Sequence, residues 1–214
     1  MENLEPLVMA KLYFYYSAMN AGKSTTLLQA AWNYREQGML PLLLTPQLNT
    51  RDGKGRIASR IGLHAEAMNF NCTDSLIEII RRSQQENSVS CIMVDEAQFL
   101  SKRQVAELGE IADIDEIPVM AFGLRTDFQG NLFEGSQFLL AWADVISEIK
   151  TICHCGRKAT MVLRVDQHRR AIRGGEQIHI GGNESYVSVC RRHFREGIAE
   201  QSGPMLPFSD PQPD

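Results

Sequence analysis

The sequence has no apolar run near the ~20 residues that a membrane-spanning helix needs. Its first residues, MENLEPLVMAK, place acids before a short apolar stretch, which is atypical of a secretion signal. Positive charge is also not in excess, because 22 Lys and Arg face 26 Asp and Glu, a formal net charge of −4. Nucleic-acid affinity comes mainly from basic side chains that neutralise phosphates. We therefore expect a cytoplasmic protein that binds neither a membrane nor nucleic acid.

Cysteine is scarce and odd in number, with five residues, three of them in the last third of the chain. In a chain without a secretion signal, such cysteines are more typical of thiols or metal ligands than of disulfides. Four of the eight prolines lie in residues 203–214. This composition predicts a disordered tail over residues 199–214.

Short apolar runs alternate with helix-like stretches in the first two thirds of the chain. Residues 11–16, 40–45, 91–95 and 118–123 are typical of buried strands, and residues 24–37, 75–86 and 102–111 of helices. Asp74 and Ser101 are suited to N-caps and Gly38 to a helix end. The alternation predicts an α/β fold with a parallel sheet that helices cover on both faces.

Two other segments differ from this pattern. Residues 49–62, NTRDGKGRIASRIG, are polar and glycine-rich and indicate a mobile loop. After Lys150, short strand-like segments surround a CHC sequence and an Arg- and Gly-rich stretch. We therefore predict three parts: a nucleotide-binding domain over residues 1–148, a small metal-binding lobe over residues 149–198, and the tail.

The first motif follows the first predicted strand. Residues 17–24, SAMNAGKS, fit the phosphate-binding pattern GxxxxGK[ST] except at its first glycine, where Ser17 stands. In such a loop, backbone N–H groups face the phosphates. Gly22 would allow the tight turn, Lys23 would reach the β- and γ-phosphates of ATP, and Ser24 would ligate Mg²⁺. The alternative is a chance Gly-Lys-Ser at the start of a helix.

The second motif is CIMVDEAQF, residues 91–99, in which a buried strand ends in two carboxylates. Open α/β sheets bind ligands at the carboxyl ends of their strands. Asp95 would hold Mg²⁺ through water, and Glu96 could take a proton from an attacking hydroxyl. A plain Asp-Glu helix cap is the alternative. The order and spacing of the two motifs predict a nucleotide site.

A third motif combines Cys153 and Cys155 with Cys190 and His193, in the sequences CHC and CRRH. Two such pairs supply the four ligands of a tetrahedral Zn²⁺ site. His154 is a competing ligand, and three unrelated thiols are the alternative. With all four positions filled by protein, the zinc would be structural and would clamp a lobe too small for a large core.

Several motifs in order resemble the type II thymidine kinases: Met-x-x-Gly-Lys-Ser, Asp-Glu-x-Gln-Phe, Thr-Asp-Phe-Gln-Gly and Ile-Gly-Gly-x-x-x-Tyr-x-x-x-Cys. The resemblance spans residues 10–194. It implies a P-loop domain related to the RecA-like ATPases and a zinc-bound lobe with a lasso loop. It also implies transfer of the ATP γ-phosphate to the 5′-hydroxyl of thymidine, or of deoxyuridine, in nucleotide salvage. A homotetramer and feedback inhibition by thymidine triphosphate belong to the same expectation.

The resemblance assigns roles residue by residue. The nucleotide-binding set is Ser17, Ala18, Met19, Asn20, Ala21, Gly22, Lys23, Ser24, Asp95, Glu96, Ala97 and Gln98, with Arg51 as a further phosphate contact. Glu96 matches the catalytic base. The nucleoside set is Met19, Phe99, Leu124, Phe128, Phe133 and Tyr186, together with the lasso residues Ile178, His179, Ile180, Gly181 and Gly182. Cys153, Cys155, Cys190 and His193 match the zinc set. Asn49 departs from the pattern, because family members often carry Asp there.

The nucleoside set also makes chemical sense by itself. Aromatic rings suit the flat apolar faces of a base, and paired glycines let backbone approach its polar edge. Ordinary core packing and a plain turn are the alternatives.

Two other functions compete with the kinase. One is a nucleic-acid-dependent RecA-like ATPase with a zinc ribbon, in which Glu96 would activate water. The other is a regulatory module without turnover. ATP turnover stimulated by thymidine or by single-stranded DNA separates the kinase from the ATPase.

Overall fold

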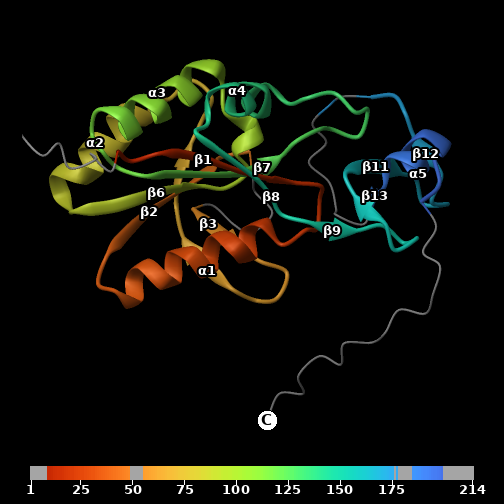
Figure 1. Ribbon diagram of the computed structural model, residues 1–214, viewed down its shortest axis with the longest axis horizontal. Coiled ribbons are helices and arrows are strands. Elements are labelled where there is room, and N and C mark those ends of the chain that lie inside the picture. Colours follow the sequence, from red (N-terminus) through yellow and green to blue (C-terminus); the bar gives the residue numbers. More distant parts are fainter. Residues whose placement is uncertain (1–8, 49–54, 176, 178–184, 200–214) are drawn as a thin grey trace, which may run out of the picture.

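A computed structural model of the protein describes residues 9–48, 55–175, 177 and 185–199. Its centre is a six-stranded sheet in the order β5-β2-β6-β7-β1-β8, and every pairing in it is parallel (Figure 1). The strands are β1 (Leu12–Ser17), β2 (Leu40–Pro46), β5 (Met68–Phe70), β6 (Val89–Val94), β7 (Val119–Leu124) and β8 (Val145–Glu148). The predicted parallel α/β fold is confirmed.

Helices cover both faces of the sheet. Helix α1 (Lys23–Glu36) lies on one face, and α2 (Leu76–Glu86), α3 (Lys102–Asp113) and α4 (Glu134–Trp142) lie on the other (Figure 1). The side chains of each strand alternate between the two cores. In β6, Met93 packs with Leu27 of α1, whereas Ile92 packs with Leu108 of α3. This alternation decides which strand-end residues face the α1 side, where the predicted phosphate loop lies.

The helix ends follow their capping residues. Ser101 forms a complete capping box with Gln104 at the start of α3, as predicted. Gly38 has a left-handed backbone, φ 72°, directly after α1, which is the position that favours glycine. Asp74 is not the cap of α2, because Ser75 accepts from the backbone N–H of Glu78. Asp74 instead accepts from the backbone N–H of Asn71 and closes the preceding turn.

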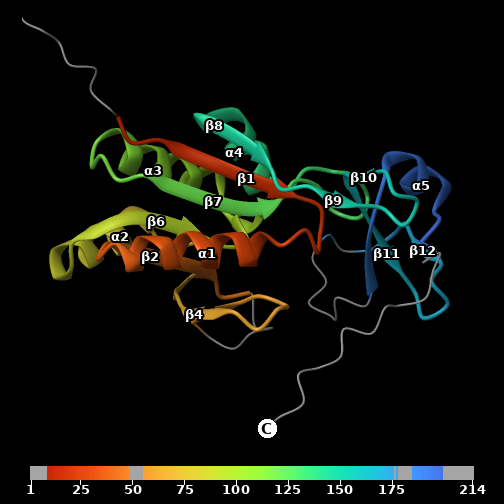
Figure 2. The same cartoon turned by 60° about the horizontal axis from the view of Figure 1, so that its bottom comes forward.

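A hairpin lies within the segment predicted to be a loop. Strands β3 (Arg56–Ala58) and β4 (His64–Glu66) pair antiparallel beside α1 (Figure 2). Ile57 and Ala65 are buried against α1. The loop interpretation of residues 55–62 was therefore wrong in part, because two apolar side chains among polar neighbours are enough to anchor the hairpin. Residues 49–54 lie outside the described part of the chain.

In its described residues, the lobe after β8 consists of small sheets and one short helix. It contains β9 (Thr151–Ile152) paired with β10 (Lys158–Ala159), the sheet β12-β11-β13, and α5 (Arg191–Glu196). Strand β12 spans Ala171–Ile172, β11 Met161–Val165 and β13 Tyr186–Val189. Its core is small and includes Leu163, Val189 and Ala199. The tail predicted over residues 199–214 begins one residue too early, because Ala199 is buried in this core. Residues 200–214 lie outside the described part of the chain.

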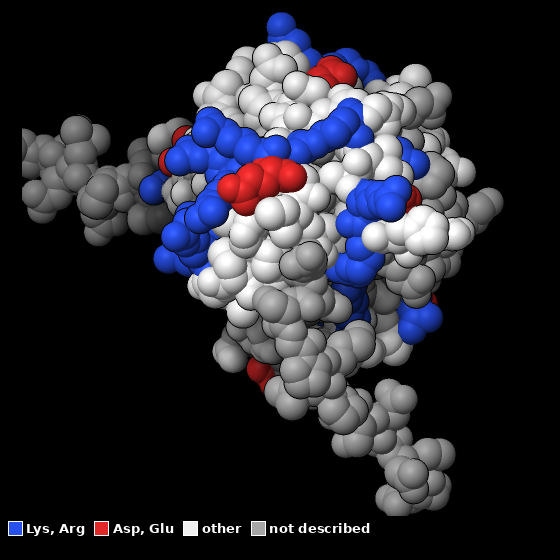
Figure 3. Space-filling view, turned by 90° about the vertical axis from the view of Figure 1, so that its right-hand side faces the viewer, with Lys and Arg blue, Asp and Glu red and all other residues white. Residues whose placement is uncertain are grey.

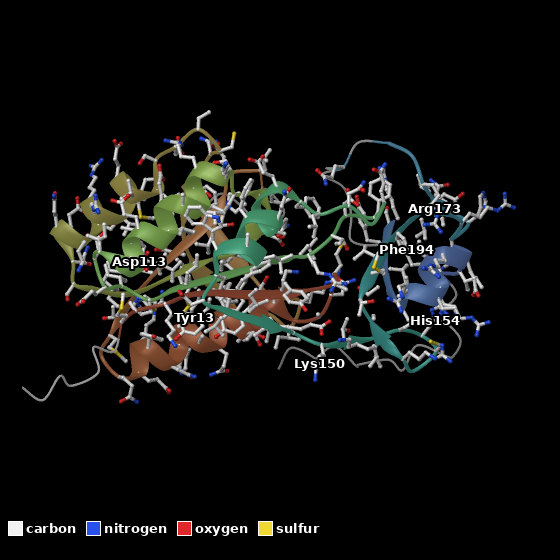
Figure 4. All side chains as sticks on the ribbon, turned by 45° about the horizontal axis from the view of Figure 1, so that its top comes forward. Tyr13, Asp113, Lys150, His154, Arg173 and Phe194 are labelled. Atoms are coloured by element: carbon white, nitrogen blue, oxygen red, sulfur yellow. The ribbon has the colours of Figure 1, made fainter. Side chains whose placement is uncertain are left out.

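The outer end of this lobe is rich in Lys and Arg side chains (Figure 3). Arg173 lies over the ring of Phe194 at 4.8 Å and thereby fixes α5 to the loop after β12 (Figure 4). Lys150 lies at the junction of sheet and lobe (Figure 4).

Within the described ranges, we find no helix long and apolar enough to cross a membrane.

Candidate active site

The predicted phosphate loop joins the end of β1 to the start of α1. Gly22 has φ 88° and Asn20 has φ 61°, so the chain turns through two left-handed positions before the helix begins. No side chain caps the N-terminus of α1 within the described structure. Its first N–H groups can therefore donate hydrogen bonds to an anion, since a helix N-terminus carries partial positive charge. Lys23 is 8% exposed at this point.

Asp95 faces this loop from the end of β6. The Ser24 hydroxyl lies 3.4 Å from Asp95 Oδ2. Burial raises the pKa of Asp95 to about 7; the Glu96 carboxylate adds to the rise, and Lys23 opposes it. Asp95 Oδ1 is buried and has no hydrogen-bond partner in the described part of the chain. A buried carboxylate oxygen of this kind fits the hydration shell of a divalent cation.

Thr45, at the end of the neighbouring strand β2, also has a buried side-chain oxygen without a hydrogen-bond partner in the described part of the chain. Its side chain is 1% exposed, and Oγ1 has no partner among the described residues. Leu44 pairs with Val94, so Thr45 and Asp95 follow adjacent positions of two parallel strands. Leu43 and Met93 belong to the α1-side core, and alternation directs Thr45 and Asp95 to that same side. Two polar atoms without a partner among the described residues thus lie at the carboxyl ends of adjacent strands, on the side of the phosphate loop.

Thr45 was not predicted from the sequence, because it is a single threonine at the end of an apolar run.

Glu96 has an unusual backbone. Its φ of 48° and ψ of 41° are left-handed, a region that is uncommon outside glycine. Its carboxylate accepts from Gln98 Nε2 at 2.5 Å, and Gln98 Oε1 accepts from the backbone N–H of Leu124 at 2.9 Å. Gln98 is 2% exposed. The buried amide therefore connects Glu96 to the end of β7.

Outside the phosphate loop, the structure describes five of the predicted nucleoside residues. Phe99 ends the 3₁₀ turn η1 (Ala97–Phe99), and its ring meets Phe133 edge to face at 5.8 Å. Leu124 is fixed at both backbone groups, since Ser136 also donates to its carbonyl at 2.5 Å. Phe128 is buried under the Arg164 guanidinium of the lobe, 5.4 Å from the ring centre. Tyr186 is half-buried at the start of β13.

Helix α4 was missed in the sequence and is essential to this arrangement. Gly135, in its first turn, lies so close to η1 that an added Cβ would be 2.5 Å from the carbonyl oxygen of Ala97. Only glycine allows this approach. The helix therefore brings Phe133 next to Phe99. Its sequence, EGSQFLLAW, has glycine at the second position, and glycine is a poor helix former, so the start of this helix gave no clear signal.

The predicted zinc ligands come together in the lobe. The ligand atoms of Cys153, Cys155, Cys190 and His193 all lie within 4.8 Å of one another. Cys155 Sγ and Cys190 Sγ are 3.9 Å apart, close to the ~3.8 Å expected for two thiolates at ~2.3 Å from a tetrahedral zinc. The distance is far longer than a disulfide bond. The donor set and its spacing therefore fit zinc.

His154, the competing ligand, lies outside the four-residue cluster. Its ring stacks on that of His193 with centres 4.3 Å apart. The backbone N–H of His193 lowers the pKa of the Cys190 thiol, which favours the thiolate form that a metal needs. Arg51 and Asn49 lie outside the described residues, as do the lasso residues Ile178, His179, Ile180, Gly181 and Gly182.

A parallel sheet with a phosphate loop after its first strand and an acidic strand end beside it is typical of the P-loop nucleotide-binding proteins. Here a lobe with a cluster of metal-ligand residues is attached to this sheet. The family model described as thymidine kinase matches residues 10–194. The chain therefore belongs to the thymidine kinase family, and it is an enzyme with thymidine kinase activity.

Relatives over most of the chain agree with this assignment. A thymidine kinase of Rhodopirellula baltica is 58% identical over 202 residues, which cover 94% of this chain and 96% of the relative. A thymidine kinase of Shewanella oneidensis is 62% identical over 190 residues, covering 89% and 99%. Among solved structures, one described as an ATPase domain aligns with a TM-score of 0.43 and 14% identity over 64% of this chain and 68% of that one.

Proposed function

We propose that the segment from Asp95 to Phe99 is the point where the two substrates of a thymidine kinase meet. Asp95 faces the phosphate loop through Ser24, and Phe99 forms the aromatic pair with Phe133. Glu96 lies between them in sequence and is half-buried. This single arrangement supports transfer of the ATP γ-phosphate to the 5′-hydroxyl of thymidine, with deoxyuridine as a second substrate.

On the phosphate side, the proposal gives each residue one task. The N–H groups of residues 17–24 and the ammonium of Lys23 would hold and neutralise the β- and γ-phosphates. Ser24 and Asp95 would hold Mg²⁺, directly and through water, and their facing oxygens support this role. The ion would neutralise charge on the transferred phosphoryl group when bound. Phosphoryl transfer depends mostly on positioning and charge, which these groups can supply.

On the nucleoside side, Glu96 would take the proton of the 5′-hydroxyl. The amide of Gln98 donates to its carboxylate and so holds the carboxylate in place. Phe99, Phe133, Phe128 and Tyr186 would enclose the base, together with Met19, Leu124 and the lasso residues. Backbone groups of the lasso would pair with the edge of thymine and leave little room for a purine.

The zinc would be structural. Its four protein ligands would leave no open position for water or substrate, so it would take no part in the reaction. It would join the loop after β9 to the N-terminus of α5, since these two segments supply the ligands. The free state of all five cysteines fits a reducing compartment, and we propose the cytoplasm.

Two proposals concern partners. Self-association into a tetramer is supported by exposed apolar side chains near the sheet edge, where Trp142 is 55% exposed and Ile146 is 45% exposed. Inhibition by thymidine triphosphate is supported because that molecule carries both a thymine base and a triphosphate. It could therefore occupy the aromatic site and the phosphate loop together.

The decisive experiment incubates purified protein with labelled ATP and either thymidine or single-stranded DNA. We expect labelled thymidine monophosphate with thymidine and no stimulation of ATP hydrolysis by DNA. Hydrolysis that depends on DNA, without a labelled nucleoside product, would favour the nucleic-acid-dependent ATPase and contradict the proposal. The comparisons give that alternative no support.

A further inference from the structure

The zinc lobe makes direct contact with the phosphate loop. The hydroxyl of Ser188, in β13, donates a hydrogen bond to the backbone carbonyl of Met19. The two residues are 169 positions apart in the sequence. Ser188 belongs to the lobe and Met19 to the turn between β1 and α1, so the bond connects the two parts of the protein at the nucleotide site.

The position of Ser188 in its strand connects this bond to two other sites. Alternate residues of a strand share a face, so Tyr186 and Ser188 of β13 have the same orientation, while Val187 and Val189 pack into the core of the lobe. Cys190 follows the strand directly as the N-cap of α5. Tyr186 is the aromatic residue proposed for the nucleoside, and Cys190 is one of the four clustered metal ligands. Strand β13 and the residue that follows it thus carry a proposed nucleoside residue, a contact with the phosphate loop and a proposed zinc ligand.

A second link runs parallel to the first. The backbone N–H of Arg125 donates to the carbonyl of Ser17 at 3.3 Å, and its guanidinium donates to the carbonyl of Thr160 at 3.1 Å. The N–H of Thr160 in turn donates to the carbonyl of Val189 at 3.1 Å. Both the first and the third residue of the phosphate loop are therefore joined to β13.

The hydrogen bond from Ser188 is made to the residue directly before a strained position of the loop. Asn20 follows Met19 with φ 61°, a left-handed conformation that costs energy for a residue other than glycine. A loop that binds anions must turn its N–H groups inward and its carbonyls away, because a carbonyl oxygen repels phosphate. The hydroxyl of Ser188 holds the Met19 carbonyl toward the lobe and so stabilises the peptide orientation on which the following N–H groups depend.

We propose that Ser188 is a positioning residue for ATP, through which the zinc lobe fixes the conformation of the phosphate loop. In this role it acts through the carbonyl of Met19. The inference rests on the proposed function in one respect, that residues 17–24 bind the phosphates. It adds that the lobe, which the proposal assigns to thymidine, also determines the affinity for ATP.

The test compares Ser188→Ala with the wild type in binding of a non-hydrolysable ATP analogue, without thymidine. Loss of one hydrogen bond of ordinary strength should raise the Kd about three- to tenfold. Ser188→Thr keeps a hydroxyl on a residue that suits a strand and should restore the Kd to within about twofold. Ser83→Ala, which removes a half-buried hydroxyl from α2, is the matched control and should bind as the wild type does.

Two measurements separate positioning from general damage. Zinc content and the melting temperature should stay at the wild-type values in Ser188→Ala, while the KM for ATP rises more than kcat falls. An unchanged Kd in Ser188→Ala would overturn the inference, and so would a raised Kd accompanied by lost zinc. Wild-type protein that binds the analogue but does not phosphorylate thymidine would contradict the proposed function alone.

Discussion

The amide of Gln98 donates to the carboxylate of Glu96 over 2.5 Å, which ties the proposed base to a side chain that is 2% exposed. The oxygen of the same amide, Gln98 Oε1, accepts from the backbone N–H of Leu124 at the end of β7. Glu96 has a left-handed backbone, and such a conformation persists when its surroundings fix it. The position of the carboxylate is therefore determined by a neighbour two residues away rather than by its own strand.

Gln98→Met should lower kcat about tenfold with little change in either KM. Methionine has a similar length but cannot donate to Glu96, and it leaves the buried N–H of Leu124 unpaired, which costs ~1–3 kcal/mol of stability. Steady-state kinetics and denaturant unfolding measure the two effects. The control is Gln84→Met, since Gln84 accepts from the N–H of Val89 at the opposite end of the sheet. Equal loss of kcat in both variants would show that only stability was affected.

Glu96→Gln should retain both substrate affinities and lose turnover by ~10²–10⁴-fold, the usual contribution of a general base. Single-turnover kinetics with saturating ATP and thymidine would measure this loss. Glu116→Gln is a suitable control, because Glu116 is exposed and also has a left-handed backbone, φ 53°. Turnover above half the wild-type value in Glu96→Gln would exclude the role of base.

Lys23→Ala should reduce kcat by ~10²-fold or more, because a preorganised charge beside the transferred phosphate is lost. Binding of ATP should weaken more than binding of thymidine, which calorimetry with each ligand can measure. Lys11→Ala removes an exposed lysine just before β1 and should change neither. Weaker thymidine binding with normal ATP binding would move the phosphate site elsewhere.

Cys190→Ser should lower the zinc content from about one ion per chain and raise the KM for thymidine. Affinity for ATP should also fall, to about the level of Ser188→Ala, since Ser188 lies two residues from this ligand. His154→Ala should keep its zinc, because the ring of His154 stacks beside the ligand cluster without belonging to it. Elemental analysis and kinetics provide both readouts. Full thymidine affinity in a metal-free variant would contradict the structural role of zinc.

Much of the fold could be predicted because its signals are local. The strands around Cys91 and Phe122 are apolar runs bounded by polar segments, and the capping box at Ser101 lies within four residues. The zinc cluster could also be predicted, since its ligand types and spacing are distinctive. These features depend on neighbouring residues or on chemistry that few side chains share.

The remaining features depend on contacts between distant segments. Helix α4 carries Gly135 in its first turn, where glycine is a poor helix former but the only residue that fits beside the carbonyl oxygen of Ala97. The role of Thr45 depends on Asp95, which follows the adjacent strand. The role of Ser188 depends on Met19, in a turn near the other end of the chain. A single serine or threonine carries no pattern from which such a partner could be inferred.

The spacing of β13 also limits how the enzyme can vary in evolution. A single inserted or deleted residue between Tyr186 and Cys190 would reverse the orientation of every side chain on one side of the change. The aromatic residue, the hydroxyl and the metal ligand could then no longer keep their present orientations relative to one another. Length differences among relatives should therefore fall outside this five-residue stretch, whereas substitutions at Val187 and Val189 need only preserve apolar volume.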